Sequence, residues 1–148
     1  MSLNTTECCT LSMDLAAPHG IDDGLMIWEV TGGEIKGEDI SGTIISPGGD
    51  WMSVNKNIAT VDVRGQAKME DDSILYFEYK GRAVFEDGGG LKNNYLAVAP
   101  IYRTSSEKYG YLNDHMYIGK MVDFKMPEGP KGSGKEGSVT YTVHRVDH

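Results

Sequence analysis

The sequence predicts an all-β fold: a single closed or nearly closed antiparallel barrel of about eight strands, with one short helical turn. Short apolar segments alternate with turn residues, and the 19 glycines lie between these segments rather than in one block. The 148 residues suit one domain, 1–148, with one core. Sequential antiparallel strands form a sandwich or an up-and-down barrel, and we favour the barrel because closure leaves no exposed strand edge.

Four extended segments are predicted in the first third of the chain. They cover residues 8–17, 25–31, 40–46 and 51–54. The first alternates loosely between apolar and polar side chains and ends before Pro18. Gly32 and Gly33 predict a break or bulge after the second, and Pro47-Gly48-Gly49 predicts a turn between the last two.

Residues 58–69 and 75–85 form the clearest pair of strands, because both alternate with period two around the polar turn Asp71-Asp72-Ser73. The apolar face of the first carries Ala59, Val61, Val63, Gly65, Ala67 and Met69. The apolar face of the second carries Leu75, Phe77, Tyr79, Gly81, Ala83 and Phe85. Two such strands joined by a short turn predict a hairpin.

The remaining predicted strands cover 95–104, 116–124 and 139–146. Pro100 lies inside the first of these and predicts an edge or bulge position, since proline cannot donate a ladder hydrogen bond. The predicted short helix is 105–113, where Ser105 or Ser106 would cap the start. The Pro/Gly/Lys-rich segment 127–137 is predicted to be a mobile hairpin loop.

Composition and charge exclude several classes of partner. The net charge is −8 and no run of Lys or Arg occurs, so neither nucleic acid nor an anionic lipid surface is an expected partner. No leader-like or membrane-spanning segment is visible, and we expect a cytoplasmic protein. The adjacent Cys8 and Cys9 suit two reduced thiols, because neighbouring cysteines bridge only with strain. We expect neither a metal nor a cofactor.

The segment Gly129–Glu136 nearly matches a phosphate-binding loop, but two requirements of that motif are missing. Glu136 stands where the motif needs a hydroxyl for magnesium. A strand pattern follows the segment, whereas a phosphate-binding loop opens a helix. We therefore interpret the segment as a hairpin loop.

Asp62 and Arg64 are two residues apart on a predicted strand, so their side chains share a face. This pair fits a solvated outer wall with a weak surface ion pair. It also fits a charged pair facing the lumen, where the carboxylate serves as a base and the guanidinium orients an oxygen. The spacing alone favours the outer wall.

Several segments together resemble an uncharacterised family of small proteins called domain of unknown function 3237. The matching segments are Gly32-Gly33, Gly42, Pro47–Trp51, Asp62-Val63-Arg64, Asp71-Asp72, Tyr79-Lys80-Gly81, Ala99–Thr104, Tyr109–Asn113, Gly119 and Tyr141-Thr142-Val143. The resemblance implies a closed barrel of about eight strands. It also implies that one site contains Asp50, Trp51, Asp62, Arg64, Tyr79 and Asn113.

Our first hypothesis is a small-molecule-binding barrel with non-covalent acid–base chemistry, of isomerase, cyclase or lyase type, on a carbonyl or aromatic compound. Its candidate catalytic residues are Asp62 as base, Arg64 and Asn113 as oxygen-holding groups, and Tyr79 as proton donor. Its candidate substrate-binding residues are Asp50, Trp51, Tyr111 and His115. The alternatives are a non-catalytic carrier, which predicts a wholly apolar lumen, and a homodimer-forming structural barrel, which predicts an apolar outer patch.

Overall fold

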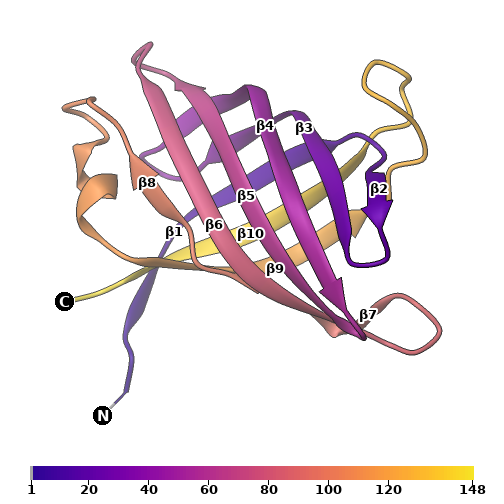
Figure 1. Ribbon diagram of the computed structural model, residues 1–148. Coiled ribbons are helices and arrows are strands. Elements are labelled where there is room, and N and C mark those ends of the chain that lie inside the picture. The colour runs from indigo at the N-terminus through magenta and orange to yellow at the C-terminus, as the bar shows by residue number, and fades with distance from the viewer. Residues whose placement is uncertain (1) are drawn as a thin grey trace.

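Eight antiparallel strands close into a barrel in the computed structural model, which describes residues 2–148 (Figure 1). The described chain has ten strands, of which β2 and β8 lie outside the ring: β1 (Thr5–Leu15), β2 (His19–Asp22), β3 (Leu25–Lys36), β4 (Ser41–Asn55), β5 (Ile58–Met69), β6 (Ile74–Phe85), β7 (Leu91–Val98), β8 (Ile101–Arg103), β9 (Tyr117–Lys125) and β10 (Gly137–Val146). The order β1-β10-β9-β7-β6-β5-β4-β3 returns to β1 through β1–β3 pairing, which closes the ring. The predicted fold class is confirmed.

The β5–β6 hairpin forms the middle of one wall and keeps one register from end to end. Ile58 pairs with Val84 and Lys68 with Ile74, without a bulge between them. All six residues of the predicted apolar face of β5 are buried, and the alternate residues are exposed or half-buried. The period-two pattern therefore fixes which side chains of this wall face the interior.

The structure corrects the prediction of two strands separated by a turn at residues 47–49. The chain runs through this segment as the single strand β4, and a bulge lies between Ile45 and Gly49. A bulge absorbs the extra residues and bends the strand without reversing it. The predicted break at Gly32-Gly33 is also a bulge, within β3, and Gly33 has a φ of 126°.

Pro100 divides the predicted strand 95–104 into two pieces. β7 and β8 both pair with β6, and the Ala99–Pro100 step lies between them. The predicted helix is shorter than expected, a 3-10 helix η1 over Gly110–Asp114. Its N-cap residue is Tyr109 and no side chain caps it, so the predicted capping by Ser105 or Ser106 is wrong. Ser106 Oγ accepts a hydrogen bond of 3.1 Å from the backbone amide of Tyr109 in the turn ahead of the helix.

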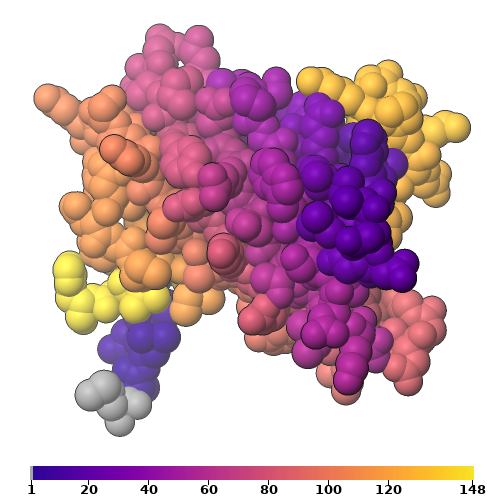
Figure 2. All heavy atoms as spheres, in the orientation of Figure 1, coloured from indigo at the N-terminus to yellow at the C-terminus, as the bar shows by residue number. Residues whose placement is uncertain are grey.

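Both ends of the barrel wall carry additional segments. β8 and η1 cover one end, and the loop between β9 and β10 lies at the other end beside β2 (Figure 1). This loop is tied to the body, because the amide of Ala17 donates to the carbonyl oxygen of Gly129 at 3.0 Å. The last residues lie beside the start of β1, as Figure 2 shows, and Thr6 donates to Asp147 there. Over residues 2–148 no helix is long and apolar enough to cross a membrane.

Candidate functional site

A cavity occupies the end of the barrel opposite η1. The volume that the centre of a water molecule can occupy in it is about 90 Å³. The whole space between its walls, including the part open to solvent, is about 660 Å³. Its lining consists of Met13, Leu15, Trp28, Val30, Asp50, Met52, Val61, Val63, Tyr79, Ala83, Phe85, Leu91, Leu96, Phe124, Met126, Val139 and Tyr141. Nearly all of these side chains are apolar, so its few polar groups decide what chemistry the cavity can support.

Asp50 is the one carboxylate of the cavity lining. Its Oδ1 accepts a hydrogen bond from the backbone amide of Asp62 at 2.9 Å. β4 and β5 pair at Asp50–Val63 and next at Ser53–Thr60, so the Asp62 amide lies in an interval of the ladder without paired residues. The Asp50 carboxylate accepts the hydrogen bond of this amide. Burial raises the pKa of Asp50 to about 6, against the lowering effect of that amide. A carboxyl with this pKa can accept or release a proton near neutral pH.

Tyr79 and Tyr141 meet across the lumen from opposite walls. The Tyr79 hydroxyl donates to the Tyr141 hydroxyl at 3.3 Å, and the two rings pack edge to face at 5.4 Å. Along β6, Ala83 on one side of Tyr79 lines the cavity, whereas the buried Phe77 on the other side does not. Along β10, Val139 on one side of Tyr141 lines the cavity, whereas the buried Val143 on the other side does not. The tyrosine pair therefore forms the floor of the cavity. Burial is the main cause that raises the pKa of both phenols, and Asp50 adds to it, so both remain protonated donors at neutral pH.

Trp28 supplies a third polar group. It lies directly opposite Asp50 in the β3–β4 ladder, and both residues line the cavity. Its ring is buried, with 7% of its surface exposed, and its Nε1–H has no hydrogen-bond partner among residues 2–148. Because a buried donor without a partner costs free energy, a bound oxygen atom would be stabilised there.

Trp28, Asp50, Val63 and Tyr79 form one row across the wall, each paired with the next through the ladders. Adjacent members of such a row have Cβ atoms roughly 5 Å apart, so the polar groups of the row lie around one small volume. The site thus combines a carboxylate with a pKa near neutrality, two phenols and an unpaired indole N–H.

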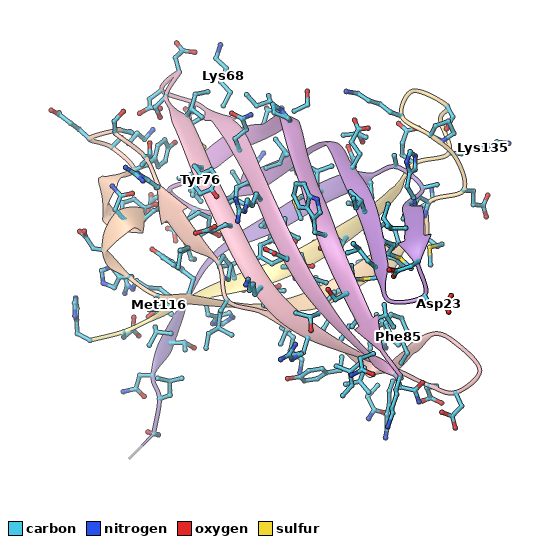
Figure 3. The ribbon with its side chains drawn as sticks, in the orientation of Figure 1. Asp23, Lys68, Tyr76, Phe85, Met116 and Lys135 are labelled. Atoms are coloured by element: carbon cyan, nitrogen blue, oxygen red, sulfur yellow. The ribbon has the colours of Figure 1, made fainter. Side chains whose placement is uncertain are left out.

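The exposed part of the cavity lining lies where β7 and β9 separate. These strands pair only at Ala97–Lys120 and Val98–Gly119, so the rest of their facing edges is not joined. Among the lining residues, Phe124 and Met126 after this pairing are exposed. Phe85, another lining residue, lies at the end of β6 (Figure 3), where it pairs with Leu91 of β7.

Asp62 and Arg64 are on the outer wall, contrary to the expectation that they face the lumen with Tyr79. The β5–β6 register has no bulge that could change the parity of either strand. Arg64 is exposed and its Nε lies 4.0 Å from Glu78. Asp62 lines an outer hollow, to which Arg64 and Tyr79 also contribute. To the luminal site Asp62 contributes only its backbone amide.

The other predicted residues are divided among three places. Trp51 is 44% exposed on the outer face of β4, next to the inward-facing Asp50. Asn113 is in η1, where its side-chain amide exchanges two hydrogen bonds of 2.9 Å with the backbone of Thr104. Tyr111 is also in η1 and is 39% exposed, and His115 Nε2, just after η1, lies 3.2 Å from His148 Nε2.

Of the eight predicted residues, the structure brings Asp50 and Tyr79 together in the cavity. Trp28 was not among the candidates, although the alternation of 25–31 places it on the same side of its strand as Val30. Tyr141 was visible as one of several strand tyrosines. Strand parity could have indicated that both rings point inward, but only the closed ring shows that they reach the same cavity.

Comparisons with known proteins agree with this architecture. Residues 4–146 match the family model described as "Protein of unknown function (DUF3237)". A UPF0311 protein from Rhodopseudomonas palustris (strain TIE-1) is 25% identical over 101 residues, which cover 61% of this chain and 66% of that relative. The match thus spans just under two thirds of the relative's length.

Three solved structures share the fold. A conserved protein of unknown function from Rhodopseudomonas palustris superposes with a TM-score of 0.81 at 20% identity, over 99% of both chains. A β-barrel-like protein from Acinetobacter baumannii AYE has a TM-score of 0.79 at 22% identity, over 99% of this chain and 98% of that one. An enzyme from Penicillium herquei has a TM-score of 0.65 at 18% identity, over 99% and 96% of the two chains. At these identities the likeness concerns the fold.

Proposed function

The chain belongs to the family described as Protein of unknown function (DUF3237), and since that description names no activity, we propose a function from the site itself. The barrel binds a small, mainly apolar carbonyl or aromatic compound in its lumen and carries out non-covalent acid–base chemistry on it, of isomerase, cyclase or lyase type. The observation that carries this proposal is the half-buried Asp50 carboxyl, with its pKa of about 6, in a cavity that is otherwise almost wholly apolar.

Each polar group has a role in this proposal. Asp50, when ionised, removes a proton from carbon or from a hydroxyl group of the bound compound, because an apolar site strengthens a carboxylate as a base. Trp28 Nε1–H donates to the oxygen on which negative charge develops. The Tyr79 and Tyr141 hydroxyls bound the site and orient a second oxygen. Asp50 therefore takes the role that the sequence suggested for Asp62.

Two further features support a catalytic reading. The barrel of similar fold from Penicillium herquei is described as an enzyme, so this architecture can support catalysis. The cavity lining also contains the flexible thioethers of Met13, Met52 and Met126. Methionine side chains adapt to ligands of irregular shape, so the inner cavity can expand around a compound larger than itself.

A carrier function is the second candidate, and the apolar lining favours it. A container needs only apolar walls and an opening, both of which the cavity has. The two functions differ in what they require of Asp50. A carrier retains its ligand unchanged and tolerates the loss of the carboxylate, whereas the proposed chemistry needs it.

Binding can be tested with the two tryptophans of the chain, since Trp28 lies in the lumen and Trp51 on the outer wall. In a Trp51→Phe variant only Trp28 fluoresces. We expect members of a library of small aromatic and carbonyl compounds to change that signal saturably. The matched Trp28→Phe variant retains only the outer tryptophan, and the same compounds should leave its fluorescence unchanged. Equal responses of both variants would contradict luminal binding.

Turnover is then tested on the compounds that bind. Each is incubated with the wild-type chain and with Asp50→Asn, and its NMR spectrum is followed for an isomerised, cyclised or dehydrated product. Conversion by the wild type that falls at least a hundredfold in the variant supports acid–base catalysis by Asp50. Binding without conversion in either chain would establish the carrier function instead.

A further inference from the structure

The strand β9 has a free edge over its second half. It pairs with β7 only at Ala97–Lys120 and Val98–Gly119, and beyond that point the edge that faces β7 has no strand partner among residues 2–148. Its other edge remains joined to β10. Residues 122–126 are all exposed, whereas buried and more exposed residues alternate along the regular strand β5. A free edge of this kind offers its amide and carbonyl groups to another strand.

The two strands that separate here differ in the regularity of their backbones. In β7, Asn93 and Asn94 both have a φ of 54°, which interrupts the extended conformation that a ladder requires. In β9, residues 121–125 include neither proline nor glycine, and none of them has a positive φ. Irregular backbone and proline are devices that protect edge strands from pairing with another chain. β9 is therefore the edge on which another strand can pair.

Large apolar side chains accompany the free edge. Val122, Phe124 and Met126 are 61%, 37% and 58% exposed. Phe124 pairs with Val139 of β10 and both line the cavity, so Phe124 is exposed although it lies on the inner face of its strand. Apolar side chains gathered beside an unpaired edge mark a surface for association with another chain.

Charge complementarity identifies a second copy of β9 as the partner strand. Two identical antiparallel strands are related by a two-fold axis, so the position of that axis sets which residues are opposite each other. With the axis at Phe124, Asp123 of each copy lies opposite Lys125 of the other. Phe124 then lies opposite its own counterpart, and Val122 lies opposite Met126. This register joins unlike charges on one face of the strands and apolar side chains on the other.

The other registers are less favourable. With the axis at Asp123, two carboxylates would lie opposite each other, and like charges in that position are destabilising. Pairing of Asp123 with Lys120 would also join unlike charges, but Lys120 is already paired with Ala97 of β7. The free part of the edge thus has one self-complementary register.

We infer that two copies of the chain form a two-fold dimer by antiparallel pairing of β9 with β9, centred on Phe124, with Asp123 of each copy opposite Lys125 of the other. This pairing covers Phe124 and Met126, the exposed residues of the cavity lining. Each copy has a net charge of −8 and the two ion pairs lie at the surface, so the dimer forms reversibly and in proportion to concentration. It does not depend on the chemistry proposed for the lumen.

The mass of the full chain, measured by sedimentation equilibrium, tests the dimer. We expect the wild type to change from the mass of one chain to that of two as its concentration rises through the micromolar range. Hydrogen exchange then locates the interface. Amides within residues 121–125 should exchange more slowly at high than at low concentration, and those within residues 91–95 of β7 should not change.

Charge exchange tests the register. Asp123→Lys and Lys125→Asp each place like charges opposite each other twice in the dimer, and each should weaken association by about tenfold or more. The double variant Asp123→Lys with Lys125→Asp should recover the wild-type affinity, and an equimolar mixture of the two single variants should form a heterodimer. Glu107→Lys is the matched control, because it makes the same change of net charge at an exposed residue between β8 and η1, and it should associate as the wild type does.

The inference fails if the wild type remains a monomer throughout this concentration range. It also fails if the wild type dimerises and both single charge variants dimerise equally well, because the interface then lies elsewhere. Single variants that weaken the dimer without recovery in the double variant would contradict the register. All altered side chains are exposed, and each variant is checked for cooperative thermal unfolding before its mass is measured.

Discussion

At the residue scale, the chemistry of the lumen depends on where Asp50 lies in its strand. The β4 bulge that precedes it sets the parity of the rest of the strand, so Asp50 and Met52 face inward and Trp51 faces outward. The carboxylate is then enclosed by apolar walls and holds a single backbone amide. One hydrogen bond compensates the desolvation of this half-buried carboxylate only in part, and the Asp62 charge also opposes ionisation, which is why the pKa of Asp50 is raised.

The raised pKa has a consequence for stability. In the unfolded chain Asp50 titrates near its ordinary value of 3.8, and in the folded protein near 6, so the folded state binds its proton more tightly. The stability associated with this group is therefore highest below about pH 4 and falls as the pH rises through about 6. Asp50→Asn removes the charge and keeps an oxygen for the Asp62 amide. We expect the variant to be more stable than the wild type at pH 8, by up to about 3 kcal/mol, and nearly equal to it at pH 4.

Urea unfolding of both chains at a series of pH values measures this difference. Asp62→Asn, which alters a carboxylate on the outer wall, is the matched control and should follow the wild type. A wild type whose stability relative to Asp50→Asn does not fall between pH 4 and pH 7 would contradict the raised pKa.

The tyrosine pair gives a second prediction. Tyr141→Phe leaves the Tyr79 hydroxyl buried without an acceptor and should cost about 1–3 kcal/mol. Tyr79→Phe with Tyr141→Phe removes both polar groups, and the double variant should lose less than the sum of the single losses. Tyr76→Phe on the outer wall, where the hydroxyl donates to Glu78, should change stability by less than about 0.5 kcal/mol. Additive single losses would show that the two hydroxyls do not interact.

At the element scale, each strand is predictable from its own residues where the sheet is regular. The bounds of β5 agree with the sequence prediction and those of β6 differ by one residue, because alternation with period two is a local property. Pro47-Gly48-Gly49 could not be assigned in the same way. The same residues suit a turn or a bulge, and only the pairing of β4 with both β3 and β5 decides for the bulge. Asp62 is a similar case. Strand parity predicts the outer wall, where the structure places it, whereas the family resemblance implies one site with Tyr79.

The close crossing of β1 and β3 depends on Gly33. Its φ is 126°, and a Cβ built there would lie 2.0 Å from the carbonyl oxygen of Ser12. Gly33→Ala must therefore shift one of two paired backbones, and we expect a loss of more than about 2 kcal/mol or failure to fold. Gly20→Ala in β2 is the matched control, because no atom lies within 4 Å of the added Cβ, and it should stay within about 1 kcal/mol of the wild type. Thermal unfolding of the two variants makes the comparison.

At the scale of the whole molecule, one continuous apolar core stabilises the barrel. Its buried side chains come from every strand of the ring and from η1. A chain of this length buries roughly 70% of its unfolded surface, enough to fold without covalent or metal cross-links. The barrel class was therefore predictable from length and pattern. The position of the cavity was not, because it depends on which inward side chains meet after the ring closes.

The same argument predicts how the molecule responds to chelators and reductants. Both cysteines are free, so a reductant has no bond to break. We expect Tm to change by less than about 2 °C on addition of excess EDTA or dithiothreitol, singly or together, in a calorimetric scan. A decrease of more than a few degrees with either reagent would reveal a cross-link that contributes to folding.

Closure of the ring also sets the order of events during synthesis. The hydroxyls of Ser12 in β1 and Thr140 in β10 hydrogen-bond at 2.7 Å although they are 128 residues apart in the sequence. At translation rates of roughly 5–20 residues per second, β1 leaves the ribosome about 6–25 s before its partner exists. β3 can pair with one side of β1 early, but the other side stays open for that interval. The nascent chain is therefore most exposed to misassociation and to chaperone capture along β1, until β10 emerges and pairs with it.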